Sequence, residues 1–260
     1  GTSATEFEDD DGNTGHSPTA EGHTTYNASV KKFGASSAEF DGTTDFLEVA
    51  DHADFTLAGG TFTIDMWVRW NSVASTVFYM QGADANDQHS FHMGGGNLTF
   101  QTIIGGSSTV IAVGAWIPSV DTWYHIAAIR GWNGNANDWA LTVDGSTVAT
   151  ATDAISTPDN SDELSIGARG RDGADSINGY IDEVRFSDTA RWTADFSGSL
   201  PSSEYTSDSN TKLLMHMNEV AATSDTTHDT TLISNTTVAE SQPDQANIVM
   251  LVENSTTTPT

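Results

Sequence analysis

The stretch NGYIDEVRFSDTARWTADF, residues 178–196, decides how the rest of the chain is interpreted. Its first half alternates apolar and polar residues, as a half-buried strand does, and we expect a strand over 180–186. Simple alternation places Asp182 on the same apolar face as Val184 and Phe186. A carboxylate on that face needs hydrogen bonds, a charged partner or a cation, because an unpaired buried charge is strongly unfavourable.

Three explanations of Asp182 remain open at this stage. The carboxylate could be buried and capped by backbone amides, or paired with Arg185 or Arg69. A β-bulge could instead rotate it to the other face. It could also be one ligand of a Ca²⁺ ion, which gathers carboxylate and carbonyl oxygens.

Short alternating runs recur along the chain, whereas helical periodicity is almost absent. The clearest run is TFTIDMWVRW, residues 61–70, in which five large apolar side chains share one face. The segment 141–150, LTVDGSTVAT, predicts a hairpin with Asp144 and Gly145 at its turn, where a positive φ costs little. About a dozen strands follow from such signals, too many for one open sheet. The predicted fold class is therefore all-β, a two-sheet antiparallel β-sandwich.

Composition excludes several classes of function. The 260 residues include no cysteine, so there is neither a disulfide framework nor a thiolate metal site. The chain has 36 acidic and nine basic residues, a formal net charge of −27, which repels nucleic acid and anionic lipid. No apolar run approaches the roughly 20 residues of a membrane span, so we expect no membrane insertion. The acidic surface favours solubility in a salty, crowded setting, or the gathering of divalent cations.

The chain divides into three segments by composition. Residues 1–25 form an acidic, apolar-poor segment that we expect to be partly ordered against the sandwich. Residues 26–217 carry the strand signals and form the sandwich itself. Residues 218–260 are a polar, Thr/Ser-rich extension in which only 247–252 could form a strand. Because the sequence begins at Gly1 rather than methionine, we expect a processed chain or a fragment.

A resemblance to a known family adds to this interpretation. The runs FGASSAEFDGTTDFLEVADHADFTLAGGTFTIDMWVRW, DTWYHIAAIRG, LTVDGSTVAT and GYIDEVRFSDTARWTADF resemble, in order and spacing, the landmarks of laminin-G-like jelly-roll modules. These modules belong to the concanavalin A-like lectin/glucanase superfamily, and the similarity covers about residues 33–217. The continuation after 186 most resembles versions in marine phage virion proteins and in bacterial adhesins. The resemblance implies a concanavalin A-like jelly roll.

The position of one strand departs from the family pattern. In tandem modules a strand like TKLLMHM precedes an acidic stretch like FEDDDGNTGH, but here the acidic stretch comes first, at 7–16. The strand lies instead at 211–217. We expect it to close the same sandwich beside the strand at 36–40, because the termini of sandwiches often lie close together.

The sequence does not carry the catalytic pair of the superfamily. Glucanases of this superfamily use a Glu-x-Asp-x-x-Glu strand motif, and the matching positions around Asp182 hold Tyr180 and Arg185. No other hydrolase or nucleotide-binding motif is present. His89 and His92 would lie on opposite faces of a strand, and the other histidines are scattered, so we predict no histidine metal site. We predict that the protein is not an enzyme.

Two kinds of binding site remain as expectations. Some related modules hold a structural Ca²⁺ between two of these landmarks, which on this chain implies Asp41, Asp45 and Asp182 as ligands. Tryptophans could stack on sugar rings, and Trp132 and Trp139 are the best candidates because GWNGNANDW reads as a polar loop without an obvious packing role. The expected ligands are therefore Ca²⁺ and a surface glycan.

The expected role is adhesion or coating on an extracellular or virion surface. The leading hypothesis is a phage virion decoration or fibre component with weak glycan contact, whose partners would be copies of itself or other virion or surface proteins. The alternatives are a secreted bacterial adhesin or filament subunit, and a carbohydrate-binding module of a glycoside hydrolase. Fold alone does not distinguish among them.

Overall fold

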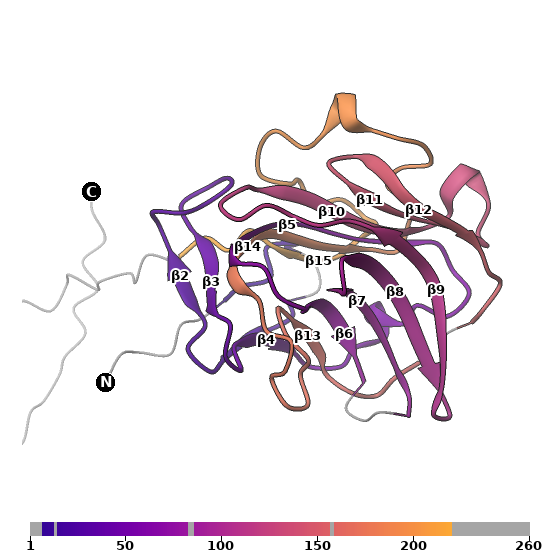
Figure 1. The fold of residues 1–260 in the computed structure, drawn as a ribbon, viewed down its shortest axis with the longest axis horizontal. Helices are drawn as coiled ribbons and strands as arrows, with labels where there is room; N and C mark the ends of the chain where they lie inside the picture. Colours follow the sequence, from indigo (N-terminus) through magenta and orange to yellow (C-terminus); the bar gives the residue numbers. More distant parts are fainter. Residues whose placement is uncertain (1–6, 13–14, 83–85, 157–158, 220–260) are drawn as a thin grey trace, which may run out of the picture. The chain divides into compact units, whose positions relative to one another are not determined.

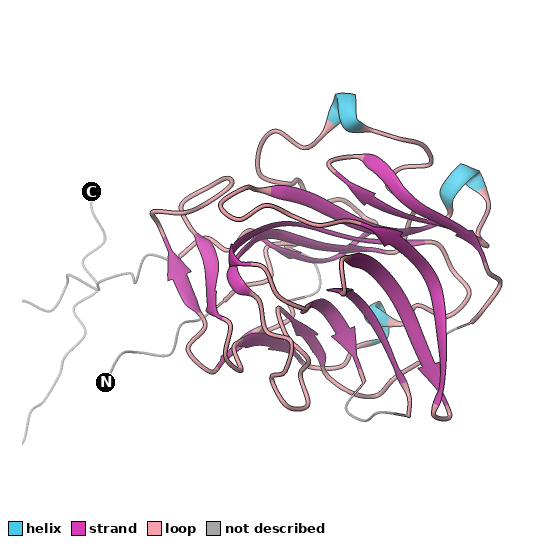
Figure 2. Cartoon of the chain, in the orientation of Figure 1, coloured by secondary structure: helices cyan, strands magenta, loops and turns pink. Residues whose placement is uncertain are grey.

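The computed structural model describes residues 7–12, 15–82, 86–156 and 159–219. Two antiparallel sheets face each other in Figure 1. The main apolar core lies between them. Short loops and three single-turn 3₁₀ helices connect the strands in the described part of the chain (Figure 2). The two-sheet antiparallel sandwich predicted from the sequence is confirmed.

The smaller sheet has seven strands. Their spatial order is β1 (Thr19–Glu21), β4 (Phe46–Val49), β13 (Leu164–Ile166), β6 (Thr76–Gln81), β7 (Gln88–Gly94), β8 (Asn97–Ile104) and β9 (Ser107–Ala115). The larger sheet has the order β12 (Ser146–Thr152), β11 (Asp138–Val143), β10 (Tyr124–Arg130), β5 (Phe62–Ser72), β14 (Asn178–Ser187), β3 (Ser37–Asp41) and β2 (Thr25–Asn27), with β15 (Thr211–Met215) paired to β14. The 3₁₀ helices are η1 (Ala53–Phe55), η2 (Trp132–Gly134) and η3 (Ser197–Ser199).

Strand β5 behaves as its alternation predicts. Its residues at 62, 64, 66, 68 and 70 all join the core between the sheets. The predicted hairpin between β11 and β12 is also confirmed, with φ of 48° at Asp144 and 71° at Gly145. Both angles are those of the turn type that best fits the twist of two paired strands.

Strand β14 departs from simple alternation because it contains a β-bulge. Asp182 lies opposite Trp67 of β5 but Arg185 lies opposite Asp65, so β14 carries one more residue than its partner here. Glu183 lies in this bulge, and its φ is 54°. The expectation that Asp182 shares a face with Val184 and Phe186 is therefore wrong, and the bulge that turns the carboxylate outward is correct.

The outer face of the larger sheet is itself covered. In Figure 1 the orange segment that follows β14, residues 188–210, loops over this face before the chain returns as β15. Apolar side chains from the segment, among them Phe196 and Tyr205, pack against outward residues of the sheet such as Trp67. We call residues 188–210 the strap.

Strand β15 closes the sandwich from within the chain. It pairs with β14, with Val184 opposite Met215 and Phe186 opposite Leu213. The expected neighbour, the strand at 36–40, is not the pairing partner of β15, although the Ser36 hydroxyl donates to the Met217 carbonyl just after β15 at 2.8 Å. The prediction of closure within the same sandwich is correct, but the partner strand is β14.

The acidic stretch at the start of the chain lies along the free edge of β15. The Asp10 amide donates to the Leu214 carbonyl at 2.6 Å, and Asp9 accepts from the Leu214 amide at 3.1 Å. Asp10 also accepts from the His216 amide at 2.9 Å. The exposed edge of an apolar strand invites aggregation, and this contact covers it.

Candidate functional site

A buried ion pair anchors the outer face of the larger sheet. The guanidinium of Arg185 donates to both carboxylate oxygens of Asp65, at 3.0 and 2.9 Å. The Nε2 atom of His125 lies 3.3 Å from the same carboxylate. Burial alone would raise the pKa of Asp65, but Arg185 and His125 overcome this effect and lower the pKa to about 2. Asp65 is therefore ionised, and both of its oxygens accept hydrogen bonds from Arg185, so it does not suit acid–base catalysis.

Two further carboxylates on β14 are buried and hydrogen-bonded, although Oδ1 of Asp182 has no hydrogen-bond partner. Asp182 accepts hydrogen bonds from the amides of Lys32 and Phe33, at 2.7 and 3.1 Å, through one oxygen. Glu183 accepts from the Tyr205 amide at 2.8 Å and contacts His216 at 3.0 Å. Both carboxylates are fully buried, so neither can reach a polysaccharide. Of the explanations for Asp182, capping by backbone amides is confirmed, together with the bulge.

Replacing Asp182 by Asn should stabilise the protein at pH 8 and change its stability little at pH 4. Burial raises the pKa of Asp182 from 3.8 to about 7, so the fold prefers the neutral carboxyl group. That preference contributes stability fully below pH 3.8 and is lost as the pH rises to about 7. Asparagine keeps an oxygen for the two amides without the charge. At about 1.4 kcal/mol per pKa unit, the expected gain at pH 8 is a few kcal/mol, measured by urea unfolding. This explanation would be contradicted if Asp182→Asn changed the free energy of unfolding by the same amount at pH 4 and at pH 8.

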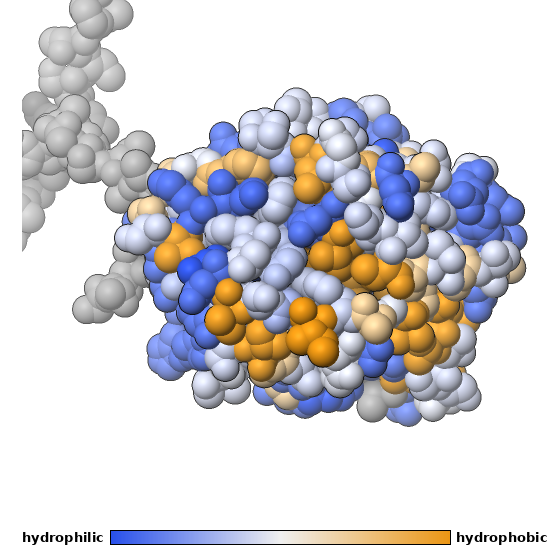
Figure 3. Space-filling model, turned by 45° about the horizontal axis from the view of Figure 1, so that its top comes forward, coloured by the Kyte–Doolittle hydropathy of each residue, from blue (hydrophilic) through white to orange (hydrophobic). Residues whose placement is uncertain are grey.

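A surface hollow lies between the end of β14 and the strap. It has a volume of about 330 Å³, at the lower limit of typical ligand sites. Its lining combines two aromatic rings with charged groups and hydroxyls, including those of Arg185, Arg191, Trp192, Ser203, Glu204 and Tyr205. Figure 3, which brings the top of Figure 1 forward, shows hydrophobic residues in separate patches among hydrophilic ones. We call this site the strap hollow.

Packing fixes the orientation of Trp192 in the strap hollow. Its indole ring stacks on Phe196 with centroids 3.9 Å apart and an interplanar angle of 7°. The ring of His125 meets it edge-on at 5.6 Å. Trp192 nevertheless stays partly exposed. A partly exposed indole in a fixed orientation can pack against the flat apolar face of a ligand. The hydrogen-bonding groups beside it can bind hydroxyls at the edge of that ligand.

A second, smaller hollow lies at the turn between β7 and β8. It has a volume of about 250 Å³, and its lining is mainly apolar and glycine-rich, including Val73, Gly95, Trp116 and Ile117. Ile117 is 78% exposed. This hollow offers few hydrogen-bonding side chains, which makes it a weaker match to a polar ligand.

The tryptophans expected to contact a glycan are buried. Trp139 lies on β11, is 1% exposed, and packs between Phe62 and Phe100 with centroids at 5.4 and 5.2 Å. Trp132 is 5% exposed and joins the cluster beneath the strap. The premise that the two side chains lack packing partners is wrong. Stacking on a sugar needs an exposed ring face, so the structure does not support these two residues as glycan contacts.

The residues expected to bind Ca²⁺ do not form one cluster. Asp41 and Asp45 lie together with His23, but Asp182 is committed to the amides of residues 32 and 33. Both oxygens of Asp45 accept backbone hydrogen bonds, from His23 and Asp41, each at 2.7 Å. Ca²⁺ needs six to eight oxygen ligands, and this set does not fit that requirement. Asp41 and Asp45 group with His23 and not with Asp182, whose Oδ2 accepts from the amides of residues 32 and 33, so these contacts give no support to one ion held by all three aspartates.

Comparison with known proteins places the fold in a described family. The Laminin_G_3 family model, described as concanavalin A-like lectin/glucanases superfamily, matches residues 41–197. No curated protein matches the chain. In the described part of the chain, no helix is long and apolar enough to cross a membrane.

Solved structures of similar fold come from several kinds of protein. Domain 4 of AbnA, a GH43 extracellular arabinanase from Geobacillus stearothermophilus, solved in complex with arabinotriose, has a TM-score of 0.56 and 16% identity over 75% of this chain and 97% of that one. The enzymatically active domain of bacteriophage CBA120 tailspike protein 2 has a TM-score of 0.56 and 12% identity over 79% of this chain and 33% of that one. The botulinum neurotoxin serotype G binding domain has a TM-score of 0.55 and 10% identity over 75% of this chain and 50% of that one. At these identities the likeness concerns the fold alone.

Proposed function

The chain belongs to the concanavalin A-like lectin/glucanases superfamily, and on that premise we propose that it is a non-enzymatic module that binds a glycan in the strap hollow. The observation that carries the proposal is the partly exposed Trp192 in a hollow lined by hydroxyl and charged side chains. A sugar ring presents one apolar face of C–H groups and a rim of hydroxyls. Trp192 would contact the apolar face, and Ser203, Glu204 and Arg191, which line the same hollow, would contact the rim.

The carboxylates of the site support binding rather than hydrolysis. Glycosidases need one carboxyl group as acid and a second as base or nucleophile, both facing the substrate. Asp65 is held in an ion pair, and Asp182 and Glu183 are capped and buried. Glu204, which lines the hollow, has no second accessible carboxylate among the residues that line it.

The setting we propose is an extracellular or virion surface, most specifically a phage virion decoration or fibre component. The acidic surface and the family resemblance of the continuation after β14 support this setting. A secreted bacterial adhesin or filament subunit is the alternative, and a carbohydrate-binding module of a glycoside hydrolase is the second alternative. The neighbouring genes distinguish the first two, because capsid and tail genes accompany a virion protein, whereas secretion genes accompany an adhesin. A carbohydrate-binding module of a glycoside hydrolase would be joined to a catalytic domain.

Removing the Trp192 ring should weaken glycan binding about tenfold without exposing any hydrolysis. A stacked aromatic contact contributes roughly 0.5–1.5 kcal/mol beyond its buried area, and about 1.4 kcal/mol corresponds to a factor of ten. The measurement is binding of wild type, Trp192→Ala and Ser203→Tyr to a glycan array, followed by titration of the best oligosaccharide. The tyrosine fills the hollow from an exposed position and leaves Trp192 packed.

The matched control is Ile117→Ala, which alters the most exposed apolar side chain of the hollow at the turn between β7 and β8. It should bind like the wild type, and no reducing sugar should be released by any of the proteins. Equal binding by Trp192→Ala, Ser203→Tyr and wild type would place the site elsewhere. Turnover that is lost in Glu204→Gln would replace the binding function by an enzymatic one.

A further inference from the structure

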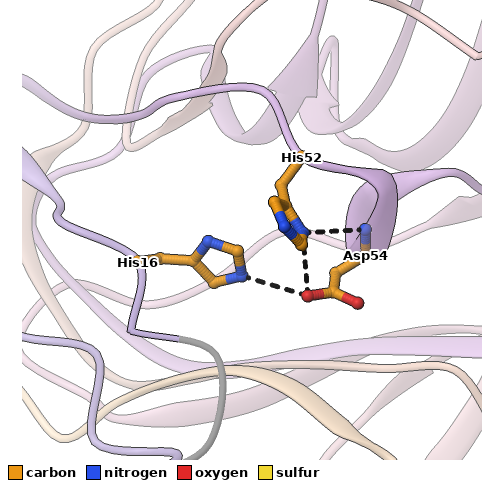
Figure 4. Close-up of side chains that lie close together, drawn as sticks. All are labelled: His16, His52 and Asp54. Atoms are coloured by element: carbon orange, nitrogen blue, oxygen red, sulfur yellow. Dashed lines mark hydrogen bonds and ion pairs between the residues drawn. The ribbon is translucent and has the colours of Figure 1, made fainter.

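Two histidines and an aspartate, none of which lines the strap hollow, converge between the N-terminal segment and η1. Figure 4 shows the rings of His16 and His52 both directed at the same carboxylate oxygen of Asp54. The Nε2 atom of His16 lies 3.5 Å from Oδ2 of Asp54. The Nδ1 atom of His52 lies 2.9 Å from the same oxygen. One ligand atom from each residue therefore falls within 4.8 Å of the other two.

The His16 side chain is buried without a hydrogen bond at its inward nitrogen. Its side chain is 7% exposed, and Nε2 has no hydrogen-bond partner. The ring rests on Phe55 at 4.7 Å, and the His16 backbone amide donates to Asp9 at 3.2 Å. These contacts fix the ring so that Nε2 points at the Asp54 carboxylate. A buried nitrogen without a partner is unfavourable unless something binds it.

The Nδ1 atom of His52 also lies close to the Asp54 carboxylate without an evident proton between the two atoms. Its Nδ1 atom accepts a hydrogen bond from the Asp54 amide at 3.2 Å, as the N-cap of η1. A nitrogen that accepts this bond carries a lone pair and has no proton to donate to Oδ2, which lies 2.9 Å away. Two electron-rich atoms at that distance repel each other unless a cation or a proton lies between them.

We propose that His16 Nε2, His52 Nδ1 and Asp54 Oδ2 bind a divalent transition-metal ion, with Zn²⁺ the best match, and that the Nδ1 lone pair of His52 turns from the Asp54 amide to the ion as the ion binds. Zn²⁺ binds histidine nitrogen and carboxylate oxygen at about 2.0–2.2 Å, which separates tetrahedral ligand atoms by roughly 3.3–3.5 Å. The observed 3.5 Å matches this spacing, whereas the 2.9 Å contact has to lengthen by about 0.4 Å when the ion enters. Two imidazoles make a poor set for Ca²⁺ or Mg²⁺, which prefer oxygen. The half-exposed His52 leaves the fourth position open to water.

The ion would tie the N-terminal segment to the loop after β4. His16 precedes β1, whereas the other two ligands flank the start of η1, whose Phe55 is fully buried in the core. A metal at this point therefore links two segments that are distant in sequence and closes one end of the core. Its expected effect is on stability, so the site is independent of glycan binding.

Two other groups in the described part of the chain bring three such side chains together, and both are weaker. In the group of His23, Asp41 and Asp45, the oxygens of Asp45 are already taken by amides and His23 is 84% exposed. In the group of Glu183, Glu204 and His216, Glu183 holds His216 and the Tyr205 amide directly. Among the residues of these three groups, only His16 has a buried side-chain nitrogen without a hydrogen-bond partner.

The test is Zn²⁺ binding to tag-free, chelator-treated protein, with calorimetry and thermal unfolding as readouts. The wild type should bind one Zn²⁺ and unfold at a higher temperature with it, whereas Ca²⁺ at the same concentration should produce no shift. His52→Asn should lose both effects, because asparagine keeps an oxygen to cap η1 but removes the imidazole. His16→Gln should do the same, and the exposed His23→Asn is the matched control that should retain both effects.

Nitrogen NMR of the histidine side chains adds a readout that does not depend on stability. Zn²⁺ should shift the resonances of His16 Nε2 and His52 Nδ1 and leave those of the buried His125 unchanged. Absence of one-to-one Zn²⁺ binding would overturn the proposal. So would binding that survives both His52→Asn and His16→Gln in proteins that remain folded.

Discussion

A chain that ends after Tyr205 should fail to fold cooperatively, because it lacks β15. Leu213, Met215 and Met217 are at most 2% exposed in the core between the sheets, and Leu214 is fully buried on the outer face. Each buried side chain of this size contributes roughly 1.5–3 kcal/mol. Their sum is comparable with the whole stability of a typical domain, roughly 5–15 kcal/mol. Urea unfolding monitored by tryptophan fluorescence measures the loss of the cooperative transition.

A chain that ends after Glu219 is the matched control. It keeps β15 and the hydrogen bond that the Glu219 amide donates to the Ser36 hydroxyl at 2.6 Å. Its unfolding midpoint should equal that of the full chain. A chain ending at Tyr205 that stays monomeric and unfolds cooperatively would show that β15 does not belong to this sandwich.

Replacing Arg185 by Met should destabilise the protein by about 3–5 kcal/mol, because it leaves the buried carboxylate of Asp65 without its main partner. The side chain of Asp65 is fully buried, so water cannot replace the guanidinium. The measurement is the change in the free energy of urea unfolding at pH 7. Asp65→Asn in the same chain should restore part of the loss, because it removes the unpaired charge.

Arg69→Met serves as the control for the loss of an arginine from the same face. Arg69 pairs at 2.8 Å with Asp121, whose side chain is 66% exposed, and such surface pairs contribute about 0–1 kcal/mol. A loss in Arg185→Met that is no larger than that in Arg69→Met would contradict the role assigned to the buried pair.

The acid sensitivity of the protein should follow from the same pair. Because the folded-state pKa of Asp65 is about 2, below its ordinary value of 3.8, the pair contributes stability above pH 3.8. That contribution is lost as the pH falls from about 4 to 2. In Arg185→Met this part of the acid-induced loss should be absent.

The sequence predicted the sandwich well because side-chain alternation reports directly on a two-layer fold. The alternation in 62–70 identified the core face of β5, and Asp144 and Gly145 identified a turn. Each of these signals is local, since it depends on neighbours within a few residues.

The bulge in β14 could not be predicted in the same way. Glu183 has no intrinsic preference for a positive φ, and the conformation persists because partners distant in sequence hold both neighbouring carboxylates. Those partners come from residues 32 and 33 and from the strap. Only the folded chain brings them to β14, so alternation alone placed Asp182 on the wrong face.

The candidate sites depend on the same long-range contacts. The polar composition before Trp139 suggested a loop, but Trp139 lies in the buried strand β11. Most of the polar residues precede this strand, so they do not indicate the burial of Trp139. Trp192 is partly exposed only because the strap holds it above His125. His16 and His52 lie in different segments, and no spacing rule joins them before the fold does.

Titration of the tryptophan side chains by NMR tests the central claim, glycan binding in the strap hollow, most directly. The chain has seven tryptophans, and each gives one indole N–H resonance that can be assigned by substitution. Addition of the best oligosaccharide from the array should shift the resonance of Trp192 in a saturable way and leave that of Trp116 unchanged. Saturable shifts at Trp116 with none at Trp192, or no shift at any tryptophan, would contradict the account.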